Sequence, residues 1–164
     1  MLLLKVFVVT ATVLTGLVGG IAFVFAAVVM PGLAMLPDRD FLRAFQKVDA
    51  VIQANQPLFL FVWIGSFVFA VTASVSGFVW ADRPTAWGLA AIAAASFGGI
   101  HLPTATINIP LNNRVQAVDF DAAGDAEVAD LRRRFETPWN RANTFRTVVA
   151  VLLTASLGGM LLRL

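Results

Sequence analysis

The sequence predicts an all-α fold: an integral membrane, antiparallel bundle of four transmembrane helices with two extramembrane amphipathic helices. Composition is the first reason, because 59% of the 164 residues are hydrophobic and only 13% are charged, whereas a soluble domain has about 25% charged residues. The second reason is that four apolar runs are long enough to cross a bilayer, which takes about 20 residues. They occupy about residues 6–30, 57–80, 86–109 and 139–162, so residues 1–164 are predicted to form a single transmembrane domain.

The first span is longer than the core of about 7–15 residues that a signal peptide has. We therefore expect a retained membrane helix and keep a cleaved signal as the less favoured alternative. Gly16 and Gly20 form a pair of small residues four positions apart, which lets two helix backbones approach closely. The helix is expected to end at residues 30–33, where the sequence reads Met-Pro-Gly-Leu.

Residues 38–55 predict the first extramembrane helix. Asp38 fits the N-cap position, and Arg43, Lys47 and Asp49 separate apolar residues that recur at helical spacing. Those apolar residues are Phe41, Leu42, Phe45, Val48, Val51 and Ile52. A helix this polar does not span a membrane, so we expect it to lie at the interface or to cap the bundle.

The second and third spans differ in character. Span 57–80 contains Trp63 and ends at Trp80, and tryptophan near both ends of a span is typical of the aromatic belts at membrane surfaces. Span 86–109 opens with mostly alanine and glycine, a composition that favours close helix contact.

The polar residues 116–136 predict the second extramembrane helix. Acidic side chains precede basic ones along this stretch, an order that complements a helix dipole. Thr137 and Pro138 match an N-cap and a first helical position. The fourth span is therefore expected to begin a new helix at Trp139.

Four spans place both termini on one side of the membrane and loops 37–56 and 114–138 on the other. Nine of the twelve lysine and arginine residues belong to the side of these two loops. The positive-inside rule then puts both loops in the cytoplasm, although the same side also has nine acidic residues. We expect the protein to lie in the plasma (inner) membrane.

The segment from His101 to Arg114 is the main functional signal. His101, Thr104, Asn108 and Asn112 recur at intervals of three, four and four, which places them on one helix face. Polar side chains at membrane depth are costly. The segment also contains two prolines, whose missing N–H groups leave backbone carbonyls in need of new partners. The pattern indicates a site inside the bundle.

The start of the fourth span adds more polar residues at a similar depth. Span three leaves the membrane on the side from which span four enters, so Asn143, Arg146 and Thr147 are predicted to face the polar end of span three. An apolar pocket with a few polar groups is typical of a small-molecule site. The alternative for each single residue is structural: an asparagine that caps a helix, a packed histidine, or an arginine that snorkels to the surface.

Other classes of site are disfavoured by the composition. One histidine and no cysteine argue against a metal or haem held by several ligands. The sequence has no glycine-rich phosphate loop, no acid pair inside a span and no basic nucleic-acid patch. Proton or ion transport is therefore poorly supported.

Three sequence motifs resemble the anthrone-oxygenase-like family of small four-span membrane proteins. They are Pro31-Gly32-Leu33, the stretch Thr106 to Asn112 (TINIPLN), and Trp139 followed by Asn143, Arg146 and Thr147. Together they cover nearly the whole chain in order. Relatives often have a second aromatic residue near the start of span four, where this chain has Ala142.

The resemblance implies oxidation of an anthrone or a similar phenolic aromatic to a quinone by molecular oxygen, with no cofactor. On that basis His101 is the expected base, and three asparagines are expected to donate to the developing oxyanion, with Arg146 holding a phenolate or fixing an asparagine. The catalytic candidates are His101, Asn108, Asn112, Asn143 and Arg146. The substrate-binding candidates are Thr104, Asn113, Trp139 and Thr147, and no metal ligand is expected.

Two other functions remain open from the sequence. One is a membrane protein that binds a quinone or a lipid without catalysis. The other is a structural partner in a membrane complex, with Gly16, Gly20, Gly98 and Gly99 at the interface. The expected partners are a small aromatic or quinone-like molecule and membrane lipids, not nucleic acid, and a homo-oligomer is left open.

Overall fold

The computed structural model describes residues 1–164 and is all-helical, without strands. The helices, together with three π-helical turns (η), are α1 (Leu2–Val24), η1 (Phe25–Val29), α2 (Met30–Ala34), α3 (Asp38–Gln53), α4 (Pro57–Trp80), α5 (Arg83–Ser96), η2 (Phe97–His101), η3 (Thr104–Asn108), α6 (Ile109–Gln116) and α7 (Asp125–Leu161). Four continuous helical stretches are long and apolar enough to cross a membrane: Leu2–Ala34, Pro57–Trp80, Arg83–Gln116 and Asp125–Leu161. These stretches support a membrane protein.

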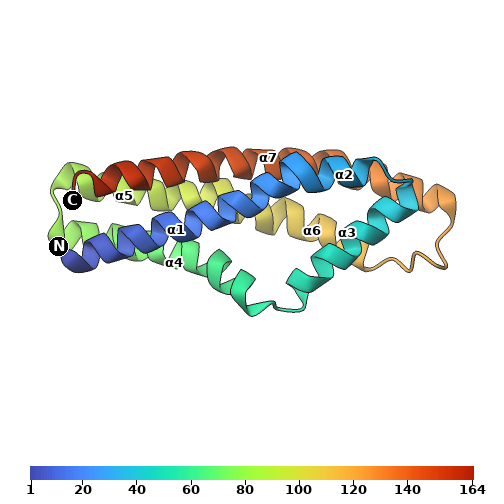
Figure 1. Cartoon of the computed structure of the whole chain (residues 1–164), viewed down its shortest axis with the longest axis horizontal. Coiled ribbons are helices and arrows are strands. Elements are labelled where there is room, and N and C mark those ends of the chain that lie inside the picture. The colour runs from blue at the N-terminus through green and yellow to red at the C-terminus, as the bar shows by residue number, and fades with distance from the viewer.

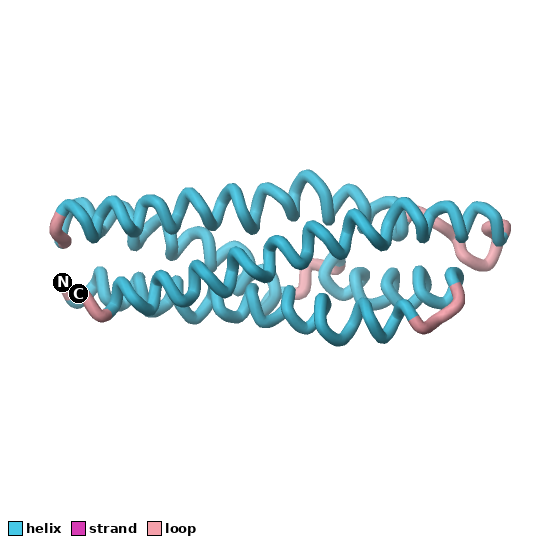
Figure 2. Tube along the Cα trace, turned by 90° about the horizontal axis from the view of Figure 1, so that it is seen from above, coloured by secondary structure: helices cyan, strands magenta, loops and turns pink.

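The long helices build two regions with separate hydrophobic cores. Near the two termini, α1, α4, α5 and α7 lie side by side (Figure 1) and enclose a cluster that includes Leu4, Leu14 and Leu157. At the other end, α3 and α6 lie beside the first half of α7, around a cluster that includes Phe45 and Phe135. The view from above shows the same elongated arrangement, with both termini at one end (Figure 2).

Each π-helical turn ends two residues before a proline. The turns η1, η2 and η3 are followed by Pro31, Pro103 and Pro110. A proline has no N–H group to donate, and its ring clashes with the carbonyl four residues earlier. A wider turn ahead of it takes up the strain and lets the helix continue. The first and third long helices therefore pass through their prolines.

The first long helix ends at Ala34, one residue after the expected end at residues 30–33, because η1 lets it continue through Pro31. One expected boundary is wrong. The second polar helix is not separate, because residues 125–161 form the single helix α7 with Pro138 inside it. Pro138 itself is exposed. Phe135 and Trp139 are buried on either side and hold both halves of α7 in one line.

Long-range hydrogen bonds hold α3 in place against α6 and the loop before α7. The Arg39 guanidinium donates to the carbonyl oxygen of Ala123 and to Asp125, both at 2.7 Å. The Gln46 amide donates to the carbonyl oxygens of Val115 and Val118 at 3.0 and 3.1 Å. These contacts fix which face of α3 turns toward α6 and α7.

Two neighbouring glycines provide a test of the helix contacts. A Cβ atom added at Gly99 would lie 2.6 Å from Cγ1 of Val149, whereas one at Gly98 would meet nothing within 4 Å. Gly99→Ala is expected to lower the free energy of unfolding by about 1–3 kcal/mol through overpacking. Gly98→Ala is the matched control and is expected to be neutral or to stabilise by up to about 1 kcal/mol. Unfolding in detergent measures both, and equal effects would contradict the packing.

The N-cap of α5 provides a test of pH dependence. Hydrogen bonds from the side chain and the backbone N–H of Thr85 hold the pKa of Asp82 below its ordinary value of 3.8. A carboxylate whose pKa is lowered by folding stabilises the protein above the unfolded pKa and stops doing so as the pH falls. The melting temperature of Asp82→Ala is therefore expected to be lower than that of the wild type at neutral pH. The difference should close as the pH falls below 3.8.

Asp82→Asn is the control for this experiment. Asparagine can still accept a hydrogen bond as an N-cap residue, but it does not titrate. Its melting temperature should therefore lack the acid-dependent loss that Asp82 contributes. A difference between the wild type and Asp82→Ala that persists at low pH would contradict the assignment.

Candidate functional site

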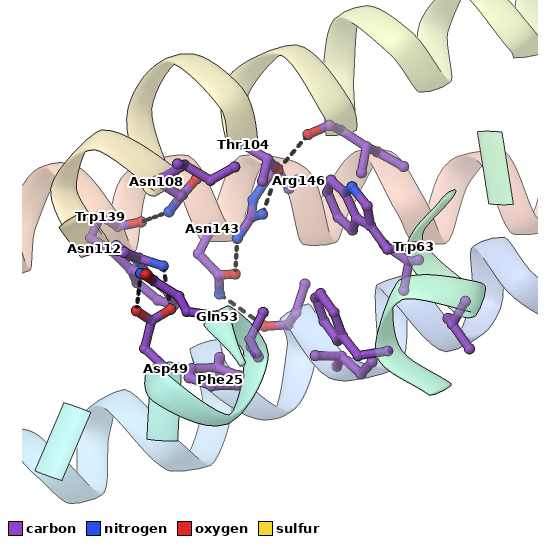
Figure 3. A pocket seen from close by; sticks show the side chains of 18 of the residues that line it. Phe25, Asp49, Gln53, Trp63, Thr104, Asn108, Asn112, Trp139, Asn143 and Arg146 are labelled. Atoms are coloured by element: carbon purple, nitrogen blue, oxygen red, sulfur yellow. Dashed lines mark hydrogen bonds between the residues drawn. The ribbon is translucent and has the colours of Figure 1, made fainter. Parts of the chain in front are cut away.

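A pocket of about 380 Å³ lies where the two hydrophobic clusters meet. Its walls come from all four long helices and from α3, and they include Val62 of the first cluster and Phe45 of the second. Phe25 in η1 and Trp63 in α4 add aromatic surface. An apolar pocket with a few polar groups is suited to a small organic molecule. Figure 3 shows the polar groups converging on this space.

Arg146 is the only cationic side chain that lines the pocket. Its guanidinium donates to the hydroxyl of Thr104 at 2.6 Å and to Oδ1 of Asn143 at 2.8 Å. It takes part in none of the six ion pairs of the structure, and its Nε atom is buried without a hydrogen-bond partner. A half-buried cation without a carboxylate is costly, and an anionic ligand oxygen would offset that cost.

Asn143 orients this guanidinium and joins α7 to α1. Its side chain is buried, and its Nδ2 atom donates to the carbonyl oxygen of Ala22 at 2.9 Å. That bond leaves Oδ1 to accept from Arg146. The amide therefore has no free rotation, and the arginine is held in a defined position on the pocket wall.

Asn108 is buried beside the pocket with one polar atom unused. Its Nδ2 atom makes a long hydrogen bond of 3.4 Å to the carbonyl oxygen of Trp139, and its Oδ1 atom has no partner. Buried acceptors are normally hydrogen-bonded. The Oδ1 atom is therefore an unsatisfied acceptor in a residue that lines the pocket.

Asp49 of α3 also lines the pocket and is buried, with 3% of its surface exposed. Its Oδ1 atom accepts from Asn112 at 2.7 Å, and its Oδ2 atom accepts from Gln53 at 2.7 Å and from Gln116 at 2.8 Å. No arginine or lysine pairs with it. Three neutral amide groups therefore surround this carboxylate in place of a cation.

Asn112 connects that carboxylate to α7. Its Oδ1 atom accepts from the indole Nε1 of Trp139 at 2.8 Å, while its Nδ2 atom donates to Asp49. Because both ends of the amide are engaged, Trp139 sets the orientation in which Asn112 holds the acid.

Seven of the nine residues predicted from the sequence line the pocket. They are Thr104, Asn108, Asn112, Asn113, Trp139, Asn143 and Arg146. His101 does not line it, and its ring instead packs against Trp63 and Phe67 at centroid distances of 4.7 and 5.1 Å. Thr147 does not line it either, and its hydroxyl donates to the backbone carbonyl of Asn143. The catalytic and binding roles of all nine remain predictions.

Sequence reasoning missed Asp49 and Gln53, which looked like the solvated face of an amphipathic helix. A usable signal was present, because Gln46, Asp49 and Gln53 follow one another at intervals of three and four. Asn112 and Gln116 are likewise four residues apart. Matching polar stripes on two helices indicate that the helices face each other. No three His, Asp or Glu side chains gather anywhere in the structure as metal ligands would.

Comparisons with known proteins place the chain at the level of a family. Searches of curated proteins and of solved structures found no match. A family model described as anthrone oxygenase matches residues 41–156. The matched range begins in α3 and ends in α7, so it contains Asp49 and the polar residues of α6 and α7. The match confirms the resemblance seen in the sequence motifs, and the chain belongs to the anthrone oxygenase family.

Proposed function

We propose that the chain is a membrane-embedded oxygenase that oxidises an anthrone-like or phenolic aromatic to a quinone with molecular oxygen. The observation that carries the proposal is the Arg146 guanidinium, which lines an apolar pocket without a carboxylate partner. An aromatic ring system fits the apolar walls. An enolate or phenolate oxygen on that ring system would supply the missing negative charge.

The unpaired polar atoms of the pocket support a ligand with two kinds of oxygen. Nε of Arg146 is a donor without an acceptor, and Oδ1 of Asn108 is an acceptor without a donor. A phenolic aromatic ketone has both an oxygen that becomes anionic and hydroxyl groups that donate. Such a molecule would satisfy both atoms, whereas a hydrocarbon would satisfy neither.

Oxidation of an anthrone by oxygen needs few protein groups beyond those that line the pocket. Loss of a proton makes an anthrone an electron-rich carbanion that reacts with oxygen directly, so we propose that no metal or flavin takes part. Donors aimed at the enolate oxygen stabilise that anion and the transition state that leads to it, each by about 10²–10³ in rate. Arg146 is the proposed donor, and Asn143 holds it in position.

The proposed setting is an antiparallel four-helix bundle across the plasma membrane. The helix α3 and the first part of α7 would lie outside the hydrocarbon region on the cytoplasmic side. The excess of lysine and arginine near these segments supports that orientation. The pocket would then lie near one membrane surface, where an apolar substrate can enter from the lipid.

The test is turnover by the purified protein in detergent, with an anthrone as substrate. Quinone formation by absorbance and oxygen uptake are expected to rise together, one oxygen molecule per quinone, and a metal chelator is expected to leave the rate unchanged. No acceleration over heat-denatured protein would contradict the oxygenase. A quinone that binds without any turnover would favour the alternative function of a quinone-binding membrane protein.

A further inference from the structure

Only two ionisable side chains line the pocket, Asp49 and Arg146. Arginine does not give up its proton in ordinary conditions, and the other polar lining residues are amides, a threonine and tryptophans. Asp49 is therefore the one lining residue that can accept a proton from a bound molecule. His101, which the sequence suggests as the base, does not line the pocket and packs against Trp63 and Phe67 instead.

The hydrogen bonds to Asp49 leave room for one more. A carboxylate offers about four acceptor positions, and three are used by Gln53, Asn112 and Gln116. Oδ1 accepts a single bond, from Asn112. This oxygen has a free position for a substrate C–H proton. The amides also hold the carboxylate rigidly, which favours a fixed approach of the reacting carbon.

Asp49 and Arg146 belong to separate hydrogen-bonded groups on the same pocket. In Figure 3, Asp49 and Asn112 lie toward one end of the view and Trp63 toward the other, with Arg146 and Asn143 between them. In an anthrone the acidic methylene and the ketone lie on opposite edges of the middle ring. A single ring system can therefore present its acidic carbon to Asp49 and its ketone oxygen to Arg146.

We propose that Asp49 is the catalytic base of this pocket, an inference that rests on the proposed function. The methylene C–H bond breaks, a carboxylate oxygen of Asp49 takes the proton, and the electron pair moves onto the ketone oxygen as an enolate beside Arg146. Molecular oxygen then accepts two electrons from the carbanion and bonds to the same carbon. The peroxide takes the proton back from Asp49, and the hydroperoxide loses water, which leaves a new ketone and an unprotonated carboxylate.

Proton abstraction by Asp49 can be measured separately from the reaction with oxygen. In heavy water without oxygen, the wild type is expected to speed deuterium uptake at the anthrone methylene. Asp49→Asn, which keeps the shape of the side chain, is expected to lower that uptake by about 10²–10⁴-fold, the usual worth of a general base. Asp40→Asn is the matched control, because Asp40 is exposed on the same helix and outside the pocket. His101→Ala is also expected to keep the wild-type rate.

Binding of the product quinone shows whether Asp49→Asn is folded. If this variant does not bind quinone, Asp49→Ala with added formate replaces it, because formate can occupy the space and act as the base. Recovery of exchange with formate supports the proposal, and no recovery overturns it. Exchange at the wild-type rate in folded Asp49→Asn, or its loss in His101→Ala alone, also overturns the assignment.

The exchange experiment separates this inference from the proposed function. A wild-type protein that exchanges the methylene proton but forms no quinone in air would overturn the oxygenase and leave Asp49 as a base. A wild-type protein that forms quinone but does not speed exchange would overturn the role of Asp49 and leave the oxygenase standing. A wild-type protein that neither speeds exchange nor forms quinone would overturn both the oxygenase and the role of Asp49.

Discussion

Replacing Arg146 with methionine is expected to lower kcat/KM for an anthrone by about 10²–10³-fold, the usual effect of losing one oxyanion donor. Methionine fills a similar volume but has no charge and no donor for the enolate oxygen. Thermal stability is expected to change little, because two effects oppose each other. The variant no longer holds an unpaired cation in an apolar pocket, but Oδ1 of Asn143 loses the hydrogen bond that it accepts from Arg146.

The same variant has a readout that does not depend on turnover. A hydroxylated anthraquinone that binds to the wild type as its phenolate should show the absorbance of the anion at a lower pH than in free solution. Arg146→Met should abolish that shift. Arg141→Met is the control, because Arg141 is exposed one turn earlier on α7 and does not line the pocket. An unchanged shift in Arg146→Met would show that the arginine does not hold the phenolate.

The polar pattern of the third and fourth spans could be predicted because each segment lies within its own continuous helical stretch. Thr104, Asn108 and Asn112 recur at helical spacing near the end of the third span, and Asn143 and Arg146 lie near the start of the fourth. The chain order alone brings these two groups together, and both line the pocket. His101 departs from the expected face because the π-helical turns on either side of Pro103 change the number of residues per turn.

Asp49 could not be placed from its own helix. An amphipathic helix with a charged side suggests contact with solvent, and α3 has several exposed charges. Asp49 is buried instead, because α3 folds back over α6 and three amide side chains replace water around the carboxylate. The polar stripe of α3 alone does not show this. It has to be matched with the stripe of Asn112 and Gln116 on α6, and the long-range contacts of Arg39 and Gln46 set the position of α3.

The unbroken helix α7 shows the limit of local signals. Thr137 and Pro138 have the residue types of a helix start, and nothing near them in the sequence says otherwise. Tertiary packing decides the outcome, because Phe135 and Trp139 are both buried in one cluster. The continuity of α7 matters for the site, since it fixes the pocket residues of α7 relative to α3 and to the cluster around Phe135.

Trp139 is expected to have the largest effect on stability among the pocket residues. Its ring packs against Phe25, Phe45 and Phe135 at centroid distances of 5.6, 5.4 and 6.1 Å. Only 4% of its surface is exposed. Trp139→Ala removes this packing and is expected to lower the free energy of unfolding by about 3–5 kcal/mol. Denaturation in detergent, followed by circular dichroism, measures the change.

Trp139→Phe separates the packing from the hydrogen bond. Phenylalanine keeps most of the aromatic contact but leaves Oδ1 of Asn112 without the indole N–H that it accepts at 2.8 Å. We expect a smaller loss of stability, about 1–3 kcal/mol, together with slower turnover because Asn112 also positions Asp49. Trp87→Ala is the control, since Trp87 is 61% exposed, and its effect should stay within about 0.5 kcal/mol. Wild-type turnover in a folded Trp139→Phe variant would show that the link from Trp139 through Asn112 to Asp49 does not serve catalysis.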